Sequence, residues 1–533
     1  MSTVDREALV TGRRSVASYL GGGLLGLGFV AFLLAWATIF QWLSETGTYA
    51  GLPLFDWLGG ILVFLAVGLA AAGLAARQGV LTATPSETAG VTVGLVFGLM
   101  WAVVGGLVAS TVVGGSTWIL GAVVGGGLGA GSAILPREDL GSTLPAATLI
   151  GLMGAVVLVG EVTVGWTWDP SWLSASFPGS EVVPVLVLFA ALLSFWSGSK
   201  AMAGFGAQGR QAGVFTLVGM SILSMLGVLV LLILFIAWNG LDVMLTGASL
   251  LGGQLAVPVL DVRLPFPELP FVTNVTGGLF VEIPGVLPAI MGTLWLIAGA
   301  VALAVPLGVG AAIFLTEYAE QGRFTQLVEV ATNGLWSTPS IVFGLFGMTF
   351  LVPRISGGNS IAVGQLVLGF MLLPLVLITS REAILAVPDE YRDASAALGV
   401  NRWETIKSVV VPAAMPGVVT GVIVGVGRIA GETAPLLLVF GGQPFPSSTP
   451  NVLGSFRLSA RPPFVTNEAL LEPASALPYQ LYSSITAGVF PKEIFTDTEF
   501  GWGTALVLLL VVIGLYTIGV GTRLYFRRKL NHE

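Results

Sequence analysis

Two charged side chains interrupt the apolar run 412–440 near the C-terminal end of the chain, in the string RIAGETAPLL. Arg428 and Glu432 are four residues apart, a spacing at which two side chains share one helix face and can pair. A charge in the core of a bilayer costs up to about 2.5–3.5 kcal/mol on insertion scales, so such a residue normally faces a bundle interior or a water-filled path. Pro435 leaves the carbonyl of Gly431 without its helical donor, which predicts a kink at this point.

Two interpretations of this pair are open. In the first, Arg428 and Glu432 neutralise each other and only fix the packing of their helix. In the second, Arg428 lowers the barrier for an anion that crosses the bundle, and Glu432 holds or releases the arginine as the helix rearranges. Thr433 and Pro435, at the predicted kink, complete this candidate translocation path.

The composition excludes most catalytic and metal sites. The chain has 533 residues, no cysteine and a single histidine, His532. Thiol catalysis, thiolate metal sites and histidine-based catalysis are therefore excluded. No GxxxxGK[ST] phosphate-binding loop occurs either. We expect neither an enzyme nor a cofactor or metal site.

The elements that must position these charges are membrane spans. The chain is 55% hydrophobic and only 10% charged, against about 25% charged in ordinary soluble domains. A bilayer-spanning helix needs about 20 mostly apolar residues. We therefore expect an all-α polytopic membrane protein with about twelve transmembrane helices. Their approximate ranges are 17–43, 57–76, 89–113, 116–135, 144–166, 181–198, 214–238, 285–316, 333–353, 361–380, 412–440 and 503–522.

The basic residues predict the orientation of these spans. If the N-terminus is cytoplasmic, twelve spans return the C-terminus to the same side. Only five of the 22 basic residues then lie outside, and Arg428 lies within a span. The five are Arg263, Arg354, Arg457, Arg461 and Lys492. This inside excess obeys the positive-inside rule and predicts a plasma-membrane protein with both termini in the cytoplasm.

The charged residues are acidic in balance and poor in lysine. The net charge is −7, and the lysines are Lys200, Lys407, Lys492 and Lys529. Such a surface suits a chain hydrated in concentrated salt, but coding bias in a GC-rich genome gives the same composition. The sequence leaves both explanations open.

The loop 389–412, between the tenth and eleventh spans, predicts two short amphipathic helices. Asp389 can cap the first, and Gly399 supplies the left-handed residue that ends it. Asn401 can cap the second, with Glu404 three residues later, and Pro412 is expected to stop it. Tethering at both ends and an acidic first helix argue against DNA binding. A plain interfacial connector and a docking knob for a cytoplasmic partner both fit.

The string DASAALGVNRWETIKSVVVP, residues 393–412, resembles the EAA loop of ABC importer permeases, which has the pattern EAA-x3-G-x9-I-x-LP. In that family the loop sits in a cleft of the ATPase subunit. The departures here roughly keep size and polarity: Asp replaces Glu, Ser replaces Ala, and Val replaces Ile and Leu. The resemblance implies ATPase coupling for Asp393, Ala394, Ser395, Gly399, Val409 and Pro412.

The string RIAGETAPLL resembles the signature of the PstA-type permease of the phosphate ABC importer. Supporting strings are GTL at 292–294, VPLGVG at 305–310, LTEYA at 315–319, TPSIVFG at 338–344 and LPYQLY at 477–482. The resemblance covers about 214–529 and implies a permease domain over 214–533, with its six spans in the type I importer arrangement. Residues 1–213 add a membrane region of about six helices, in which we expect no charge constellation beyond Glu161.

The resemblance also implies a function and a set of partners. The chain would be the permease subunit of an importer for inorganic phosphate, forming the translocation path while a separate subunit hydrolyses ATP. Its partners would be a PstC-type permease, two PstB-type cytoplasmic ATPases, membrane lipid and an extracytoplasmic phosphate-binding protein. That protein would dock on the long external segments 239–284 and 441–502.

Three alternatives stay open on the sequence. The same architecture could carry another oxyanion, such as molybdate, tungstate or sulfate. An ion-coupled secondary carrier would need no ATPase and would show inverted repeats around a midplane site. A non-transporting membrane scaffold or sensor is suggested only by residues 1–213.

Overall fold

Most of the residues that the computed structural model describes are helical. The structure describes residues 16–81, 83–113, 115–169, 174–257, 262–278, 281–320, 322–461, 464–488 and 494–532. Within these ranges, ten helices are long and apolar enough to cross a membrane, or eleven if a bent pair is counted as one span. The shorter apolar helix Trp118–Ile134 lies at the remaining predicted span. The prediction of an all-α protein with about twelve spans is confirmed. Arg6, Arg13, Arg14 and Lys492, used in the orientation argument, lie outside the described residues.

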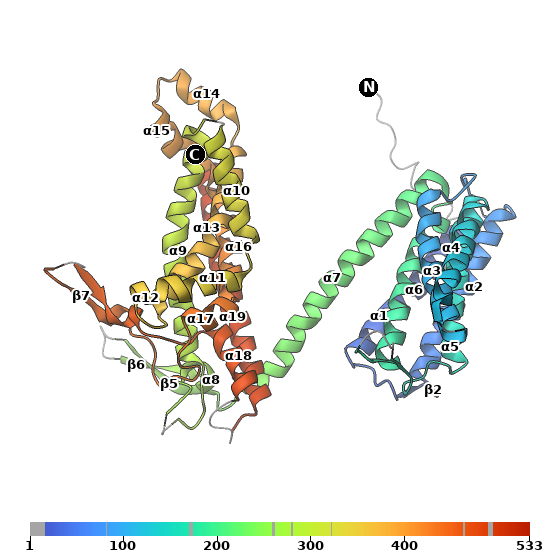
Figure 1. The fold of residues 1–533 in the computed structure, drawn as a ribbon, viewed down its shortest axis with the longest axis horizontal. Helices are drawn as coiled ribbons and strands as arrows, with labels where there is room; N and C mark the ends of the chain where they lie inside the picture. The colour runs from blue at the N-terminus through green and yellow to red at the C-terminus, as the bar shows by residue number, and fades with distance from the viewer. Residues whose placement is uncertain are drawn as a thin grey trace. The chain divides into compact units, whose positions relative to one another are not determined.

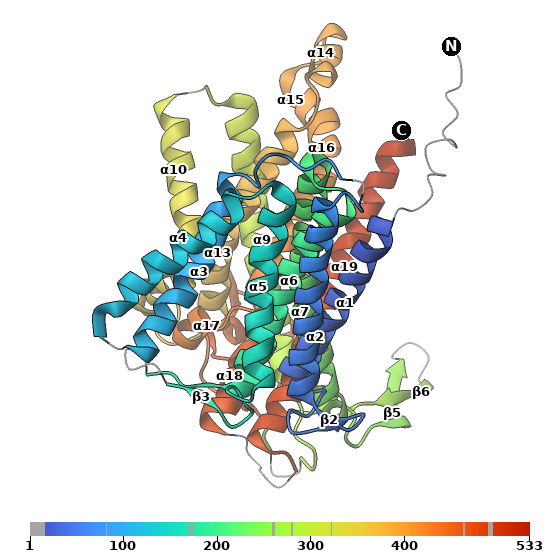
Figure 2. The same ribbon diagram turned by 90° about the vertical axis from the view of Figure 1, so that its right-hand side faces the viewer.

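The chain divides into two compact units, residues 1–229 and 230–533, with the division inside the long helix α7 (Gly206–Met244). In the first unit, three helix pairs pack closely: α1 with α6, α2 with α5, and α3 with α4 (Figure 2). The bounds are α1 Val16–Ile39, α2 Leu54–Arg77, α3 Val91–Val112, α4 Trp118–Ile134, α5 Glu138–Leu158 and α6 Gly179–Met202. The turn η2 (Gly115–Thr117) links α3 to α4, and the two-residue strand pairs β1 (Thr48–Tyr49) with β2 (Leu52–Pro53) and β3 (Thr167–Trp168) with β4 (Phe177–Pro178) close two loops.

Glycines make the α3–α4 hairpin close-packed. A Cβ added at Gly105 would collide with the carbonyl of Gly121, and one added at Gly125 with the carbonyl of Trp101. Small residues let helix backbones approach in this way where lipid offers no hydrophobic driving force. Any side chain at these positions would force the two helices apart.

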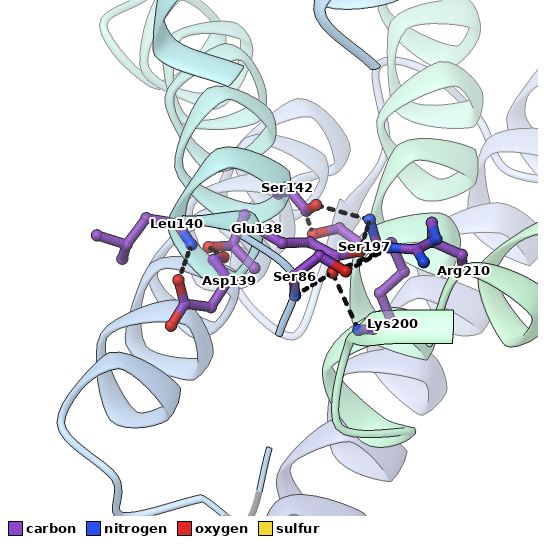
Figure 3. Close-up of polar contacts among 10 residues, drawn as sticks. Ser86, Glu138, Asp139, Leu140, Ser142, Ser197, Lys200 and Arg210 are labelled. Atoms are coloured by element: carbon purple, nitrogen blue, oxygen red, sulfur yellow. Dashed lines mark hydrogen bonds and ion pairs between the residues drawn. The ribbon is translucent and has the colours of Figure 1, made fainter. Parts of the chain in front are cut away.

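The first unit also holds a buried charge cluster that the sequence did not predict. Glu138 and Lys200 are both fully buried, and Lys200 Nζ lies 3.0 Å from Glu138 Oε1 (Figure 3). The expectation that residues 1–213 carry no charge constellation beyond Glu161 was therefore wrong. Both residues fall just outside the predicted spans, because α5 begins and α6 ends several residues beyond them.

The second unit contains α7 from Val230 onward and the helices that follow it. In chain order these are α8 Pro270–Thr273, α9 Leu287–Ile313, the π turn η3 Phe314–Tyr318, α10 Arg323–Ser337, α11 Ser340–Phe346, the π turn η4 Gly347–Leu351, α12 Val352–Ile355, α13 Ile361–Leu385, α14 Asp389–Ala397, α15 Arg402–Thr405, the π turn η5 Ile406–Val410, α16 Val411–Ala430, α17 Ala434–Val439, α18 Leu477–Ala487 and α19 Asp497–His532. The strands pair as two hairpins, β5 (Ser249–Val257) with β6 (Val262–Glu268) and β7 (Phe456–Leu458) with β8 (Val465–Asn467), and the 3₁₀ turns η6 (Leu453–Ser455) and η7 (Glu468–Leu471) flank the second hairpin.

Helix α13 is central to the second unit, because it packs against both α9 and α16. Its apolar side chains, among them Val367, Leu372 and Val376, share one buried core with Leu296 of α9 and Ile429 of α16. Figure 1 shows α14, α15 and the C-terminal end of α19 at one end of this unit. The β5–β6 and β7–β8 hairpins, α8 and α18 lie at the opposite end.

The two long segments predicted to be external are largely folded. Helix α18 is tied to α9 by a hydrogen bond from the Leu477 N–H to Thr293 Oγ1 at 2.9 Å. Gln480 Nε2 donates to Thr276 Oγ1 at 2.8 Å, joining the two segments to each other. Together with Pro288 of α9 and Ile361 of α13, residues of the 441–502 segment line a polar cavity of about 440 Å³.

Candidate functional site

The eleventh span is broken in the middle of its polar string. Helix α16 ends at Ala430 and α17 begins at Ala434, so residues 431–433 form no helix. Pro435 lies in the first turn of α17, where its missing N–H is tolerated. The kink predicted from Pro435 is confirmed, and it takes the form of a complete interruption.

The break separates the two charges. Because the helix stops two residues before Glu432, the i, i+4 geometry needed for pairing with Arg428 does not exist. The Arg428–Glu432 ion pair that the spacing allowed is absent from the described residues. The guanidinium of Arg428 instead lies over the ring of Trp336 in α10, 4.4 Å from its centroid. Such a cation–π contact positions the arginine without neutralising it.

Arg428 belongs to an uncovered face of α16. Val424, Arg428 and Gly431 recur at helical spacing, and all three are exposed. Glu432 and Thr433 are half-buried, and Pro435 is buried. An arginine within a span is strongly disfavoured against lipid, so this face suits a water-filled path or another protein surface. A self-neutralised Arg428–Glu432 pair therefore does not explain the packing of this helix.

A second bent span packs directly on the break. Helices α10 and α11 meet at Thr338-Pro339 with an angle of 101°. A Cβ added at Gly344 of α11 would lie 2.7 Å from the Cα of Pro435, so the two backbones are in close contact there. Trp336 and Gly344 therefore place α10 and α11 against both sides of the break that follows Arg428.

The loop 389–412 has the predicted helix–turn–helix form, with two differences. Gly399 has a φ of +73°, the left-handed conformation expected at a helix end, and Asn401 Oδ1 accepts from the Glu404 N–H at 3.0 Å as predicted. Asp389, however, is the first helical residue and Pro388 is the cap. Pro412 does not stop the second helix, because the π turn η5 lies directly before it and α16 continues from Val411. The wider turn makes room for the proline ring.

Two residues that sequence reasoning left without a role hold this loop in place. Arg392 Nη2 donates to Glu317 Oε1 at 2.8 Å, and Nη1 donates to the Val387 carbonyl at 2.8 Å. Arg402, at the start of α15, lies over the ring of Tyr318, 5.2 Å from its centroid. Consecutive residues of η3 thus contact both helices of the loop. Glu317 carries a charge at the end of a long apolar run, which is the signal that marks it in the sequence.

Most residues of the first helix and of the turn after it are exposed. Asp393, Ala394 and Gly399 are exposed, and Leu398 is 83% exposed. Ser395 is the buried member, and its hydroxyl donates to the Tyr391 carbonyl at 2.9 Å. Val409 and Pro412 are half-buried where the loop joins α16. An exposed leucine beside small residues is the surface expected of a partner contact.

Known proteins are similar to the part of the chain that carries the broken eleventh span and the loop 389–412. The family model described as "binding-protein-dependent transport system inner membrane component" matches residues 304–532. The probable ABC transporter permease protein YqgI of Bacillus subtilis is 33% identical over 232 residues, 43% of this chain and 75% of its own length. The phosphate transport system permease protein PstA of Haemophilus influenzae is 31% identical over 274 residues, 51% of this chain and 84% of its own. PstA of Xylella fastidiosa is 32% identical over 249 residues, 47% of this chain and 77% of its own.

Among solved structures, a chain of the MetNI methionine ABC transporter in an inward-facing conformation is similar in structure, and the alignment covers 45% of this chain and 94% of that chain. The identity is 15% and the TM-score is 0.33.

Proposed function

This chain belongs to the family of binding-protein-dependent transport system inner membrane components, as a PstA-type permease, and we propose that it carries inorganic phosphate. As a member of that family it is a membrane-spanning permease subunit of an ABC importer, not an enzyme. Residues 214–533 would act as the permease domain and residues 1–213 as an additional membrane region.

The exposed guanidinium of Arg428 beside the break in the eleventh span is the observation that carries this proposal. Its N–H groups have no hydrogen-bond partner among the residues that the structure describes, and Trp336 holds its full positive charge in position inside a span. Arginine matches the geometry of phosphate oxygens through several N–H groups. Glu432, Thr433 and Pro435 would complete the path, because the break allows this segment to change its conformation. Relatives named as phosphate permeases in two organisms favour phosphate over other oxyanions.

The loop 389–412 would transmit ATP binding and hydrolysis from the ATPase subunit. Its exposed residues Asp393, Ala394 and Leu398 would enter the cleft of that subunit, while Gly399 sets the angle between the two helices. Ser395, Val409 and Pro412 would fix the loop's own geometry. The contacts of Arg392 and Arg402 with η3 would pass a movement of the loop to α9.

The complete importer would contain a PstC-type permease, two PstB-type ATPases and an extracytoplasmic phosphate-binding protein. The uncovered face of α16 would meet the partner permease. The segments 239–284 and 441–502 would receive the binding protein. Both termini would be cytoplasmic. The C-terminal end of α19 lies at the same end of this unit as α14 and α15, which supports the same side for the C-terminus and the loop (Figure 1).

Uptake into proteoliposomes tests this proposal. The chain, reconstituted with its partner subunits, is supplied with labelled phosphate, the binding protein and ATP, and molybdate, tungstate or sulfate is added as competitor. We expect uptake that needs ATP and is not displaced by an equal excess of the other oxyanions. Displacement of labelled phosphate by molybdate or sulfate would contradict phosphate as the substrate. Uptake without ATP would contradict the coupling mechanism.

A further inference from the structure

We propose that the first unit binds one anionic phospholipid in a cleft between α3, α6 and α7, with the headgroup at Arg210. The cleft has a volume of about 500 Å³ and lies wholly within residues 1–229. Apolar side chains line most of it, including Met100, Phe189 and Leu193, and Lys200 and Arg210 lie among the lining residues. A long apolar cleft with cations in its lining suits an amphiphile with an anionic head.

The cations near the cleft exceed the carboxylates that neutralise them. Glu138 accepts from Lys200 Nζ at 3.0 Å, from Arg210 Nη1 at 3.3 Å and from the backbone N–H groups of Ser86 and Gly206 at 2.9 and 3.0 Å (Figure 3). One buried carboxylate is thus shared between two cations, and the trio carries a net charge of +1. An anion at this place completes the charge balance.

Lys200 and Arg210 differ in how many of their N–H groups are free to bind a ligand. Lys200 Nζ also donates to Ser142 Oγ at 2.7 Å and lies over the ring of Trp196, so this ammonium group is fully engaged. The side chain of Arg210 is 48% exposed, and only its Nη1 is used, by Ser86 and Glu138. Within the described residues, its Nε and Nη2 have no hydrogen-bond partner. These N–H groups are the ones available to a phosphate diester.

The cleft opens toward the outside of the helix bundle. Along α3 its lining runs from Gly90 through Thr92 and Val96 to Met100, and Thr92 and Val96 are exposed. An acyl chain can therefore enter sideways from the bilayer. Arg210 and Gly90 lie at the ends of α7 and α3 that the distribution of basic residues predicts to be cytoplasmic. On that side of a membrane, basic pockets between spans recognise anionic headgroups.

Native mass spectrometry of the full chain, purified with its partner subunits and supplied with phosphatidylglycerol or phosphatidylcholine, tests this site. We expect one phosphatidylglycerol to stay bound, and Arg210→Gln to weaken its binding by about five- to tenfold. The matched control is Arg77→Gln, which removes an exposed arginine at the end of α2 that does not line the cleft. Equal weakening by both arginine variants, or equal retention of both lipids, would overturn the proposal.

A second pair of variants leaves the buried charges intact. Val96→Trp fills the cleft and should displace the lipid, whereas Val103→Trp, two turns along the same face of α3, should not. Retention of phosphatidylglycerol by Val96→Trp would overturn the site. Added inorganic phosphate should leave lipid binding unchanged, and competition by phosphate would show a soluble-anion site in place of a lipid site.

Discussion

Arg392 Nη2 lies 2.8 Å from Glu317 Oε1, although the two residues are 75 positions apart in the chain. Arg392 Nε also donates to this carboxylate at 3.2 Å, and Nη1 donates to the Val387 carbonyl at 2.8 Å. These contacts tie α14 to η3, which follows α9, and to the residues just after α13. The loop 389–412 is therefore fixed to the membrane-spanning helices beside it.

Arg392→Gln is expected to loosen α14 without unfolding the chain. Hydrogen bonds to charged groups contribute about 1.5–3 kcal/mol each, so local opening of α14 should become about 10- to 100-fold more frequent. Hydrogen exchange of the amides in residues 389–397 measures this directly. The control is Arg381→Gln, whose bridge to Glu329 at 3.5 Å is exposed and weak. Unchanged exchange in Arg392→Gln would show that the contact does not hold the loop.

Gly399→Val is expected to uncouple transport from ATP hydrolysis. A β-branched residue at a φ of +73° is strained, and a left-handed residue costs about 1–2 kcal/mol, so the angle between α14 and α15 should change. Uptake should fall while assembly, measured by co-purification of the ATPase, persists. Gly357→Val is the matched control, because Gly357 has a φ of +70° and open space around it in a different loop. Equal losses of uptake in both variants would remove the special role of Gly399.

Gly344→Ala is expected to destabilise the contact between α11 and α17. The new Cβ would lie 2.7 Å from the Cα of Pro435, and overpacking of this kind costs about 1–3 kcal/mol. The melting temperature of the purified protein should fall by several degrees. Gly310→Ala on α9, where a Cβ meets nothing within 4 Å, should leave it unchanged or raise it slightly. A melting temperature of Gly344→Ala equal to that of wild type would mean that the backbones separate without cost.

The sequence predicted the features that depend on local chemistry. Apolar runs located the spans, Pro435 located the break, and Gly399 and Asn401 located the turn of the loop. Each of these effects acts within a few residues of its cause, so no tertiary structure is needed to see it.

Features that join distant segments were missed or predicted wrongly. Glu138 and Lys200 are 62 positions apart, and each taken alone resembles an ordinary charge at the end of a span. Helical spacing allowed an Arg428–Glu432 pair, but the break at Pro435 removes the helix on which that spacing depends. The partner of Arg428 is Trp336, on another helix, and no local pattern connects the two.

The measurement that tests the central claim most directly is ATP-dependent phosphate uptake by Arg428→Gln and Arg428→Lys in the reconstituted importer. Arg354→Gln is the matched control, because Arg354 also lies over an aromatic ring, that of Phe350 at 4.0 Å, but outside the broken span. We predict that Arg428→Gln lowers the uptake rate by about tenfold or more, equivalent to a barrier at least ~1.4 kcal/mol higher. Arg428→Lys should keep part of the rate, and Arg354→Gln nearly all of it. Normal uptake by both Arg428 variants, in complexes that assemble normally, would contradict the account and leave Arg428 with a packing role alone.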